Sequence, residues 1–342
     1  MNELLRHLAS ACYTAMRAAA LGKCLLHYNL CADAFSALTS VSVVFGSLMP
    51  DEDSELLVPP DVGSEPTQRN IMLTIAYDGA AYQGWQVQPN GVTVQECVES
   101  AVLRLTGEKR RVFCAGRTDS GVHALGQVAN FHTNSRIPVE KLRGGLQTFL
   151  PADIVVVSAS EAAATFHATY SAVTKRYRYV IFDGDVCPPF LRNYVQRSRV
   201  RLNADLMAEA AQHLLGTHDF RCFETKYPNK ETSVRTVMDV SLRRLAGWHP
   251  WTTDHDWLPA QNPRHDHADR PFIVFEIMAD GFLYNMVRAI VGTLTEIGRG
   301  KNPPECIVDV VRSMDRARAG MTAVPGGLYL VHVEYPDDLH HP

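Results

Sequence analysis

A long strand-like stretch of the chain is VTKRYRYVIF, residues 173–182. Side chains at every second position of an extended strand point to the same face, so Lys175, Tyr177 and Tyr179 share one face of this segment. Most positions on that face are apolar, which is typical of a strand with a buried face. The length of the run is at the upper end for strands, and the run therefore predicts one long strand near the middle of the chain.

Apolar periodicity predicts further strands and helices on both sides of this strand. Thr93 and Glu96 have the spacing of a capping box, and Gly107 closes the helix that follows them. We expect strands at about 71–77, 111–116, 126–132, 154–158, 234–245, 271–279 and 328–335, and helices after Thr93 and at about 138–149, 203–215, 282–298 and 304–315. Because helices and strands do not alternate as β-α-β units, the sequence indicates an α+β fold with a largely antiparallel sheet.

The composition excludes several classes of protein. The chain has 342 residues, of which 46% are apolar and 20% are charged, so it can build a full hydrophobic core. A mainly disordered protein, a collagen-like repeat and a coiled coil are excluded. No run reaches about 18 consecutive apolar residues, so the sequence predicts no membrane span. The eight cysteines include no Cys-x-x-Cys pair, which favours reduced thiols over a zinc knuckle or a disulfide framework.

The formal net charge of −4 belongs to the first part of the chain. Residues 1–69 hold 4 basic and 8 acidic side chains, whereas residues 70–342 hold 29 of each. Because residues 70–342 carry no net charge, they can bind a polyanion only through local basic patches. The candidate clusters are Lys109-Arg110-Arg111, Lys175-Arg176-Arg178, Arg197-Arg199-Arg201 and Arg243-Arg244. Each of them, taken alone, is more typical of a solvated face.

The first 69 residues differ in character from the rest. Residues 1–32 carry three basic side chains and one acid, a pattern that also occurs in mitochondrial transit segments. The acidic run at 51–55 and the prolines between 59 and 66 are typical of a linker. We expect an unstructured extension, or upstream sequence that is not part of the working protein. A targeting segment and a folded addition are the alternatives.

Residues 114–123, CAGRTDSGVH, combine many polar side chains with an apolar setting. Glycines on both sides of Arg117, Thr118 and Asp119 allow a tight turn that presents one side chain. A neighbouring guanidinium would favour the charged form of Asp119, and an ionised, positioned aspartate can act as a covalent nucleophile. The alternative is an ordinary Asp-Ser-Gly turn beside a solvated arginine, and the spacing alone favours that alternative.

This loop and several other segments together resemble the tRNA pseudouridine synthase A family. The loop residues that match are GRTDSGVHA at 116–124. The other matching segments are Tyr77-Asp78-Gly79, Tyr82-Gln83-Gly84-Trp85-Gln86, Val94-Gln95, Phe166-His167-Ala168, Lys175-Arg176-Tyr177-Arg178-Tyr179, Leu214-Leu215-Gly216 with His218-Asp219-Phe220, Phe282 with Met286-Val287-Arg288, and Gly327-Leu328-Tyr329-Leu330. They occur in the family's order from about residue 70 to residue 336, which is roughly four-fifths of the chain.

The resemblance implies a two-domain pseudouridine synthase fold, with largely antiparallel mixed sheets, flanking helices and a central active-site cleft. The expected domains are 70–170, which carries the aspartate loop, and 171–336, with an insertion at 247–270 and a tail at 337–342. The implied reaction is isomerisation of uridine to pseudouridine at positions 38, 39 and 40 in the tRNA anticodon stem-loop. The family needs no metal or organic cofactor, and its members form homodimers that share a tRNA. We expect a cytoplasmic protein, or a mitochondrial one if residues 1–69 include a transit segment.

By the same resemblance, Asp119 is the catalytic nucleophile. Attack on the sugar, attack on the base and a glycal route all remain open for it. Tyr177 is expected to contact the substrate base. Arg117 is expected to occupy the gap that this base leaves in the RNA stack when it flips out, or to contact a phosphate. Arg288 is expected to face Asp119 from the helix after Phe282. A core tyrosine and a solvated helix arginine are the alternatives for Tyr177 and Arg288.

Two parts of the chain depart from the family pattern: the N-terminal extension and the insertion at 247–270. The insertion holds three of the four tryptophans and four histidines, but its His and Asp spacing fits no regular zinc pattern. Two other functions stay open, namely a synthase for another RNA position and a tRNA chaperone that has lost catalysis. The intact Asp119 argues against the chaperone.

Overall fold

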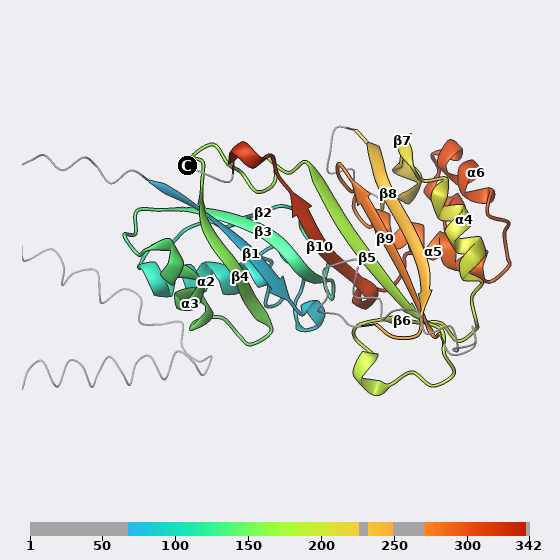
Figure 1. Cartoon of the computed structure of the whole chain (residues 1–342), viewed down its shortest axis with the longest axis horizontal. Coiled ribbons are helices and arrows are strands. Elements are labelled where there is room, and N and C mark those ends of the chain that lie inside the picture. The colour runs from blue at the N-terminus through green and yellow to red at the C-terminus, as the bar shows by residue number, and fades with distance from the viewer. Residues whose placement is uncertain (1–67, 226–231, 249–269, 340–342) are drawn as a thin grey trace, which may run out of the picture. The chain divides into compact units, whose positions relative to one another are not determined.

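A computed structural model describes residues 68–225, 232–248 and 270–339 of the chain (Figure 1). The expectations for residues 1–67, for residues 249–269 of the insertion and for the last three residues of the tail lie outside the described residues. In the part of the chain that the structure describes, no helix is long and apolar enough to cross a membrane.

The strands of the described residues form a single sheet of ten strands in the order β4-β1-β3-β10-β5-β9-β8-β7, with β2 beside β3 and β6 beside β5. Their bounds are β1 Arg69–Tyr77, β2 Phe113–Cys114, β3 His123–Thr133, β4 Ile154–Ala162, β5 Thr174–Phe182, β6 Gln196–Arg197, β7 Gly216–Asp219, β8 Val234–Leu245, β9 Phe272–Ala279 and β10 Leu328–Glu334. Only the pairs β10–β3 and β5–β6 are parallel. The predicted α+β class with a largely antiparallel sheet is confirmed, and the strands of both expected domains join in one sheet.

The last strand, β10, connects the two halves of this sheet, because it lies between β3 and β5 (Figure 1). Leu330 of β10 pairs with Ala124 of β3 on one side and with Tyr177 of β5 on the other. Neighbouring strands are spaced about 4.8 Å apart, so β3 and the middle of β5 are about 10 Å apart. The segment that leads into β3 is the predicted aspartate loop, and the sheet therefore brings that loop close to Tyr177.

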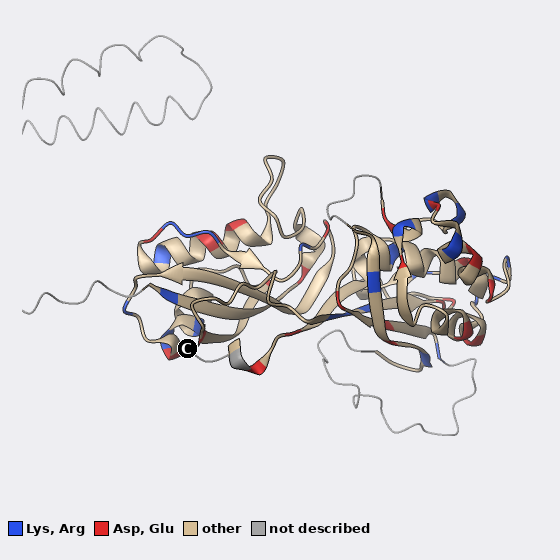
Figure 2. Cartoon of the chain, turned by 90° about the horizontal axis from the view of Figure 1, so that it is seen from above, with Lys and Arg blue, Asp and Glu red and all other residues tan. Residues whose placement is uncertain are grey.

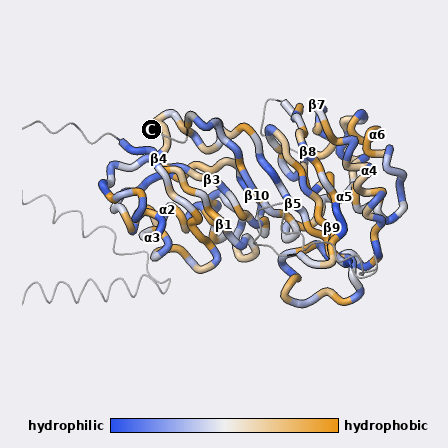
Figure 3. Tube along the Cα trace, in the orientation of Figure 1, coloured by the Kyte–Doolittle hydropathy of each residue, from blue (hydrophilic) through white to orange (hydrophobic). Residues whose placement is uncertain are grey.

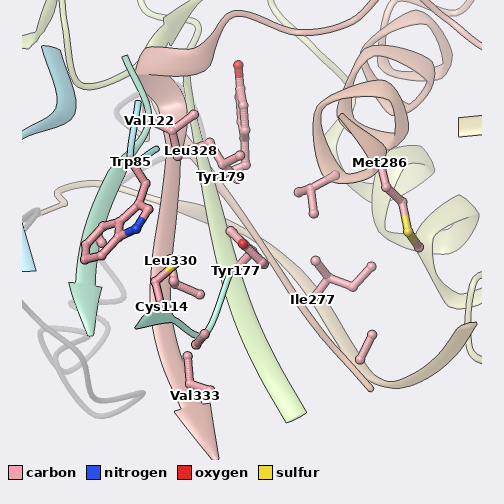
Figure 4. Close-up of a cluster of buried hydrophobic side chains, with 14 of the residues drawn as sticks. Trp85, Cys114, Val122, Tyr177, Tyr179, Ile277, Met286, Leu328, Leu330 and Val333 are labelled. Carbon is pink, nitrogen blue, oxygen red and sulfur yellow. The ribbon is translucent and has the colours of Figure 1, made fainter. Parts of the chain in front are cut away.

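The side chains of β5 alternate between its two faces, as the sequence predicts, and the second face is also buried, which the sequence does not predict. Tyr177, Tyr179 and Ile181 belong to the larger core, part of which Figure 4 shows. Val180 and Phe182 belong to a smaller core on the opposite face. Most buried strand positions are apolar (Figure 3). The larger core also contains buried residues of helices α2, α3, α4, α5 and α6, whose bounds are Val94–Thr106, Val139–Gln147, Ala204–Gln212, Met286–Gly298 and Cys306–Ser313.

The helix signals in the sequence are confirmed at α2 and need correction at α5. The Thr93 hydroxyl accepts from the Glu96 amide at 3.4 Å, and Gly107 ends the helix in the left-handed conformation, with φ of 75°. Helix α5 begins at Met286 instead of residue 282, because Asn285 has φ of 63° and cannot continue a right-handed helix backwards. The short strands β6 and β7 were not predicted, since two and four residues are too few to show a periodicity.

Candidate functional site

The loop between β2 and β3 is held by the turn that follows β1. The Trp85 amide donates to the Thr118 carbonyl at 3.0 Å, and the Ser120 hydroxyl donates to the Tyr82 carbonyl at 3.1 Å. Gly84, which has φ of +81°, permits this close approach, because a Cβ at that position would lie 2.4 Å from the Thr118 carbonyl oxygen. The backbone on both sides of Asp119 is therefore fixed by contacts with a segment more than thirty residues earlier in the chain.

Asp119 forms an ion pair with Arg288 of α5. Nη1 of Arg288 lies 2.8 Å from Oδ2 of Asp119, and the two side chains are 16% and 27% exposed. The same guanidinium donates from Nε to the Ala323 carbonyl at 2.8 Å. A charge-assisted hydrogen bond with a second fixed contact restrains both groups in one geometry. The structure therefore brings together two of the predicted site residues that are 169 positions apart in the sequence.

Arg117 occupies a different position from the one that the local spacing suggests. It lies two residues before Asp119 and is exposed. Among the ion pairs of the described residues, the cation on Asp119 is Arg288 and not Arg117. An effect of the neighbouring Arg117 on Asp119 therefore stays a prediction, and the cation that contacts the carboxylate is Arg288. The side chain of Arg117 is left available for another partner.

Tyr177 lies beside the aspartate loop and is almost fully buried. Its ring packs edge-on against Phe282 with 4.9 Å between ring centroids. A Cβ built on Gly116 would lie 3.8 Å from the Tyr177 hydroxyl, so the phenol and the loop are in contact range. Burial, with a smaller contribution from the Asp119 carboxylate, raises the pKa of Tyr177, which keeps the phenol protonated at physiological pH.

A protein-family model described as tRNA pseudouridine synthase matches residues 73–171 and 210–336, more than half of the chain. The chain belongs to the tRNA pseudouridine synthase family. Relatives named tRNA pseudouridine synthase A agree with this over 267 residues, which is 78% of the chain. The proteins of Acetivibrio thermocellus and Thermoanaerobacter sp. strain X514 are 45% and 44% identical, with all of each relative covered. The protein of Pseudoalteromonas atlantica is 39% identical, with 92% covered. The resemblance read from the sequence is confirmed, and the pseudouridine synthase is an isomerase.

Two residues of the synthase that sequence reasoning did not select also contact the site. Asn285 accepts from Nη1 of Arg288 at 2.7 Å and donates through Nδ2 to the Thr225 hydroxyl at 2.9 Å. The buried Tyr77 hydroxyl is hydrogen-bonded to the Thr118 hydroxyl at 2.8 Å. A signal for Asn285 existed in the sequence, because asparagine is one of the few residues that readily adopt the left-handed conformation before a helix. Tyr77 is part of the Tyr77-Asp78-Gly79 segment that matches the family, but its strand pattern gave no sign of a contact with the loop.

A second polar network supports the end of the loop at His123. The imidazole lies 3.1 Å from the Asp78 carboxylate and 3.0 Å from the Asn193 carbonyl. The Tyr194 hydroxyl donates to the other oxygen of Asp78 at 2.5 Å. The hydrogen bond with His123, followed by the one from Tyr194, lowers the pKa of Asp78 well below its usual range. The charged form of Asp78 is therefore part of the folded structure.

The basic clusters differ in their exposure, and several of their members are internal ion pairs. Arg178 is 1% exposed and pairs with Glu276 at 2.6 Å, while Arg244 pairs with the buried Asp183 at 2.8 Å. These two arginines are therefore not surface contacts for RNA, contrary to the sequence expectation. Arg111 is 51% exposed, with Glu99 at 3.4 Å. Along the ribbon of the described residues, basic and acidic positions are interspersed (Figure 2).

Within the described ranges, no group of three or more His, Cys, Asp or Glu side chains is placed to hold a metal ion. The histidines of the insertion at 249–269 lie outside the described residues.

Proposed function

We propose that this pseudouridine synthase converts uridine to pseudouridine in tRNA, at positions 38, 39 and 40 of the anticodon stem-loop, with Asp119 as the nucleophile. The observation that carries the proposal is the Asp119–Arg288 ion pair beside the buried Tyr177 ring. The choice of tRNA as substrate is supported by the names of the family and of its relatives. The choice of the three positions rests on the family resemblance described above.

The reaction is an isomerisation, so its atoms must balance without an external reactant. The bond from N1 of uracil to C1′ of the ribose breaks, the base turns, and C5 bonds to C1′. C5 loses a proton, N1 gains one, and no electron is transferred. Asp119 serves as the nucleophile at C1′ or at the base, or assists a glycal route, by stabilising the separated sugar and base.

The environment of Asp119 suits this task. Arg288 donates to Oδ2, and no hydrogen bond or ion pair among the described residues occupies Oδ1, so one carboxylate oxygen can face the substrate. An arginine held by the Ala323 carbonyl and by Asn285 does not need to reorganise during the reaction. Arg288 acts as a positioning residue for the carboxylate in this scheme.

Tyr177 and Arg117 would act on the base and on the RNA chain. A flipped-out uracil needs an aromatic contact to replace the neighbours that it loses, and Tyr177 offers a neutral ring next to the loop. Arg117 is exposed on the same loop as Asp119. Its planar guanidinium can stack in the vacated space or bind a phosphate.

The site draws on both expected domains, and we extend the proposal to the assembly. Domain 70–170 supplies Arg117 and Asp119, while domain 171–336 supplies Tyr177 and Arg288. A homodimer whose subunits share one tRNA would double the number of small basic patches available to the RNA. The larger number of patches would favour RNA binding, because residues 70–342 hold equal numbers of basic and acidic side chains. We place the enzyme in the cytoplasm.

The test is nucleotide-resolved mapping of pseudouridine in unmodified tRNA transcripts after incubation with the full chain. The wild type should modify only positions 38, 39 and 40, and Asp119→Asn should modify none. Asp185→Asn, which changes an exposed aspartate elsewhere, is the matched control and should act as the wild type does. Modification at other positions would support the alternative specificity. Tight binding without any modification by the wild type would support the chaperone.

A further inference from the structure

Three aromatic side chains form a contiguous row that is exposed at the surface. The row consists of Phe113 on β2 and of His167 and Tyr170 in the turn that precedes β5. The ring of His167 lies 4.9 Å from that of Phe113 and 4.5 Å from that of Tyr170, measured between centroids. Phe113 is 37% exposed and Tyr170 is 85% exposed. We call these three residues the aromatic row.

The turn that carries the row is held firmly, although Tyr170 itself faces solvent. The Ser171 amide donates to the His167 carbonyl at 2.9 Å, and the His167 amide donates back to the Ser171 hydroxyl at 3.1 Å. The Thr169 hydroxyl donates to the Cys114 carbonyl at 2.6 Å, which ties the turn to the strand next to Phe113. A large aromatic ring held at the surface loses little conformational freedom when a flat ligand stacks on it.

The central ring of the row is uncharged at neutral pH. Burial, aided by the neighbouring His132, lowers the pKa of His167. The Thr169 amide donates to Nδ1 of His167 at 3.1 Å, which leaves the proton of the neutral ring on Nε2. The row therefore offers flat rings with an uncharged hydrogen-bond donor between them.

The aromatic row includes a residue of the short strand that leads into the proposed catalytic loop. Phe113 and Cys114 are the strand residues from which that loop starts, and Asp119 follows five residues after Cys114. Exposure alternates here, so Arg111 lies on the same side as Phe113 and is also exposed. The exposed Lys109 precedes it. Exposed cationic side chains thus lie close in sequence to Phe113, in the segment that leads into the proposed catalytic loop.

We propose that the aromatic row binds unpaired nucleotides of the RNA substrate by base stacking, next to the nucleotide that reacts. The proposal rests on the RNA-modifying function proposed above and adds a second binding site for that RNA. Every base has a flat face that stacks on an aromatic ring, and stacking does not depend on base identity. Arg111 would contact the phosphates of the same nucleotides, as arginines do beside stacked bases.

A second copy of this chain is a less suitable occupant for the row. The centres of protein–protein interfaces are depleted of charged residues, whereas Lys109 and Arg111 accompany the aromatic row. Single-stranded nucleic acid needs this combination, because the backbone requires cations and the bases require rings.

The experiment compares four single substitutions in the full chain, with tRNA transcript as the probe. Tyr170→Ser removes the most exposed ring, and Tyr170→Trp keeps a ring at the same place. Phe190→Ser is the matched control, because Phe190 is 81% exposed on a different turn. Arg111→Gln removes a charge beside the row. Binding is measured in an Asp119→Asn background, so that turnover does not change the RNA, and KM and kcat are measured with Asp119 intact.

Tyr170→Ser should weaken tRNA binding about tenfold and raise KM by a similar factor, with kcat and the melting temperature unchanged. Its slope of log affinity against log salt should equal that of the wild type, because no phosphate contact is lost. Tyr170→Trp should restore binding, and Phe190→Ser should have no effect. Arg111→Gln should instead reduce the salt slope by about one unit.

Equal binding by the wild type and Tyr170→Ser would overturn the proposal. Dissociation of a dimer by Tyr170→Ser, seen by sedimentation with RNA absent, would instead identify the row as a contact between copies. Both outcomes can be distinguished from failure of the proposed function. If the proposed function were wrong, the wild type would not modify tRNA at all. The comparison of tRNA binding between the variants would still test the aromatic row.

Discussion

Asn285 offers a sharp test of how Arg288 positions Asp119, because its backbone and side chain can be changed separately. Its φ of 63° is unfavourable for most residues but easily adopted by glycine. Asn285→Gly therefore keeps the backbone at the start of α5 and removes only the side chain that binds Arg288 and Thr225. Asn285→Asp keeps the acceptor for Arg288 and adds a negative charge.

The expected magnitudes follow from the geometry at Nη1 of Arg288. Removing one hydrogen bond to a charged group costs about 1.5–3 kcal/mol when the group is buried. The partial exposure of the site reduces this to about 1 kcal/mol, so Asn285→Gly should lower kcat about fivefold. In Asn285→Asp, two carboxylates would contact the same nitrogen, since the present oxygens lie 2.7 and 2.8 Å from it. At a separation of at most about 5.5 Å, their repulsion is about 3 kcal/mol at an effective dielectric constant of 20.

Solvent screening at this partly exposed pair reduces that repulsion by about half, which corresponds to roughly one pH unit. The acid limb of the pH dependence of kcat should therefore move upward by about one unit in Asn285→Asp. It should not move in Asn285→Gly. The assay is single-turnover pseudouridine formation between pH 4 and 8, together with thermal unfolding of each variant. An unchanged pH profile for Asn285→Asp, in a protein that melts as the wild type does, would refute the positioning role of Asn285.

Three further predictions concern the support of the loop, stability and the extension. Gly84→Ala should cost about 2 kcal/mol of stability or more and lower activity, measured by urea unfolding and turnover, because a Cβ would lie 2.4 Å from the Thr118 carbonyl oxygen. Asp78, whose folded pKa is lowered, stabilises the fold above its unfolded value near 4, and this contribution is lost as the pH falls. The urea midpoint of the wild type should therefore drop more steeply from pH 5 to pH 3 than that of Asp78→Asn; parallel curves would contradict this. A chain that begins at Gln68 should fold and modify tRNA as the full chain does, and loss of activity or solubility would show that residues 1–67 support the core.

Local patterns in the sequence were sufficient for most individual elements of the fold. The alternation of β5 and the cap at Thr93 are determined by neighbouring residues, so they can be read directly. The position of β10 between β3 and β5 could not be read, because it depends on pairing between strands that are far apart in the chain. The contacts within the site could not be predicted from spacing for the same reason. Spacing alone pointed to Arg117 as the cation near Asp119, and only the family resemblance pointed to Arg288.

The sequence also could not predict which basic residues are exposed and which form internal ion pairs. Arg178 looks like a surface residue in a basic run, but register places it directly opposite Glu276 on β9. Arg244 likewise pairs with Asp183, 61 residues away. Ion pairs of this kind depend on which strands are neighbours, and sequence spacing does not show this. The exposed Lys109 and Arg111 are better candidates for RNA contacts than a count of charges would suggest.

The most direct test of the central claim follows the hydrogen at C5 of the target uridine. The proposed isomerisation replaces the C5–H bond by a C5–C1′ bond, so tRNA labelled with tritium at C5 should release tritium to water in a single turnover. Wild-type protein in excess should release the label from positions 38, 39 and 40. Asp119→Asn should bind the tRNA with the same affinity as the wild type. It should release tritium at less than about a thousandth of the wild-type rate. Release by Asp119→Asn at a rate near that of the wild type would contradict the nucleophilic role of Asp119.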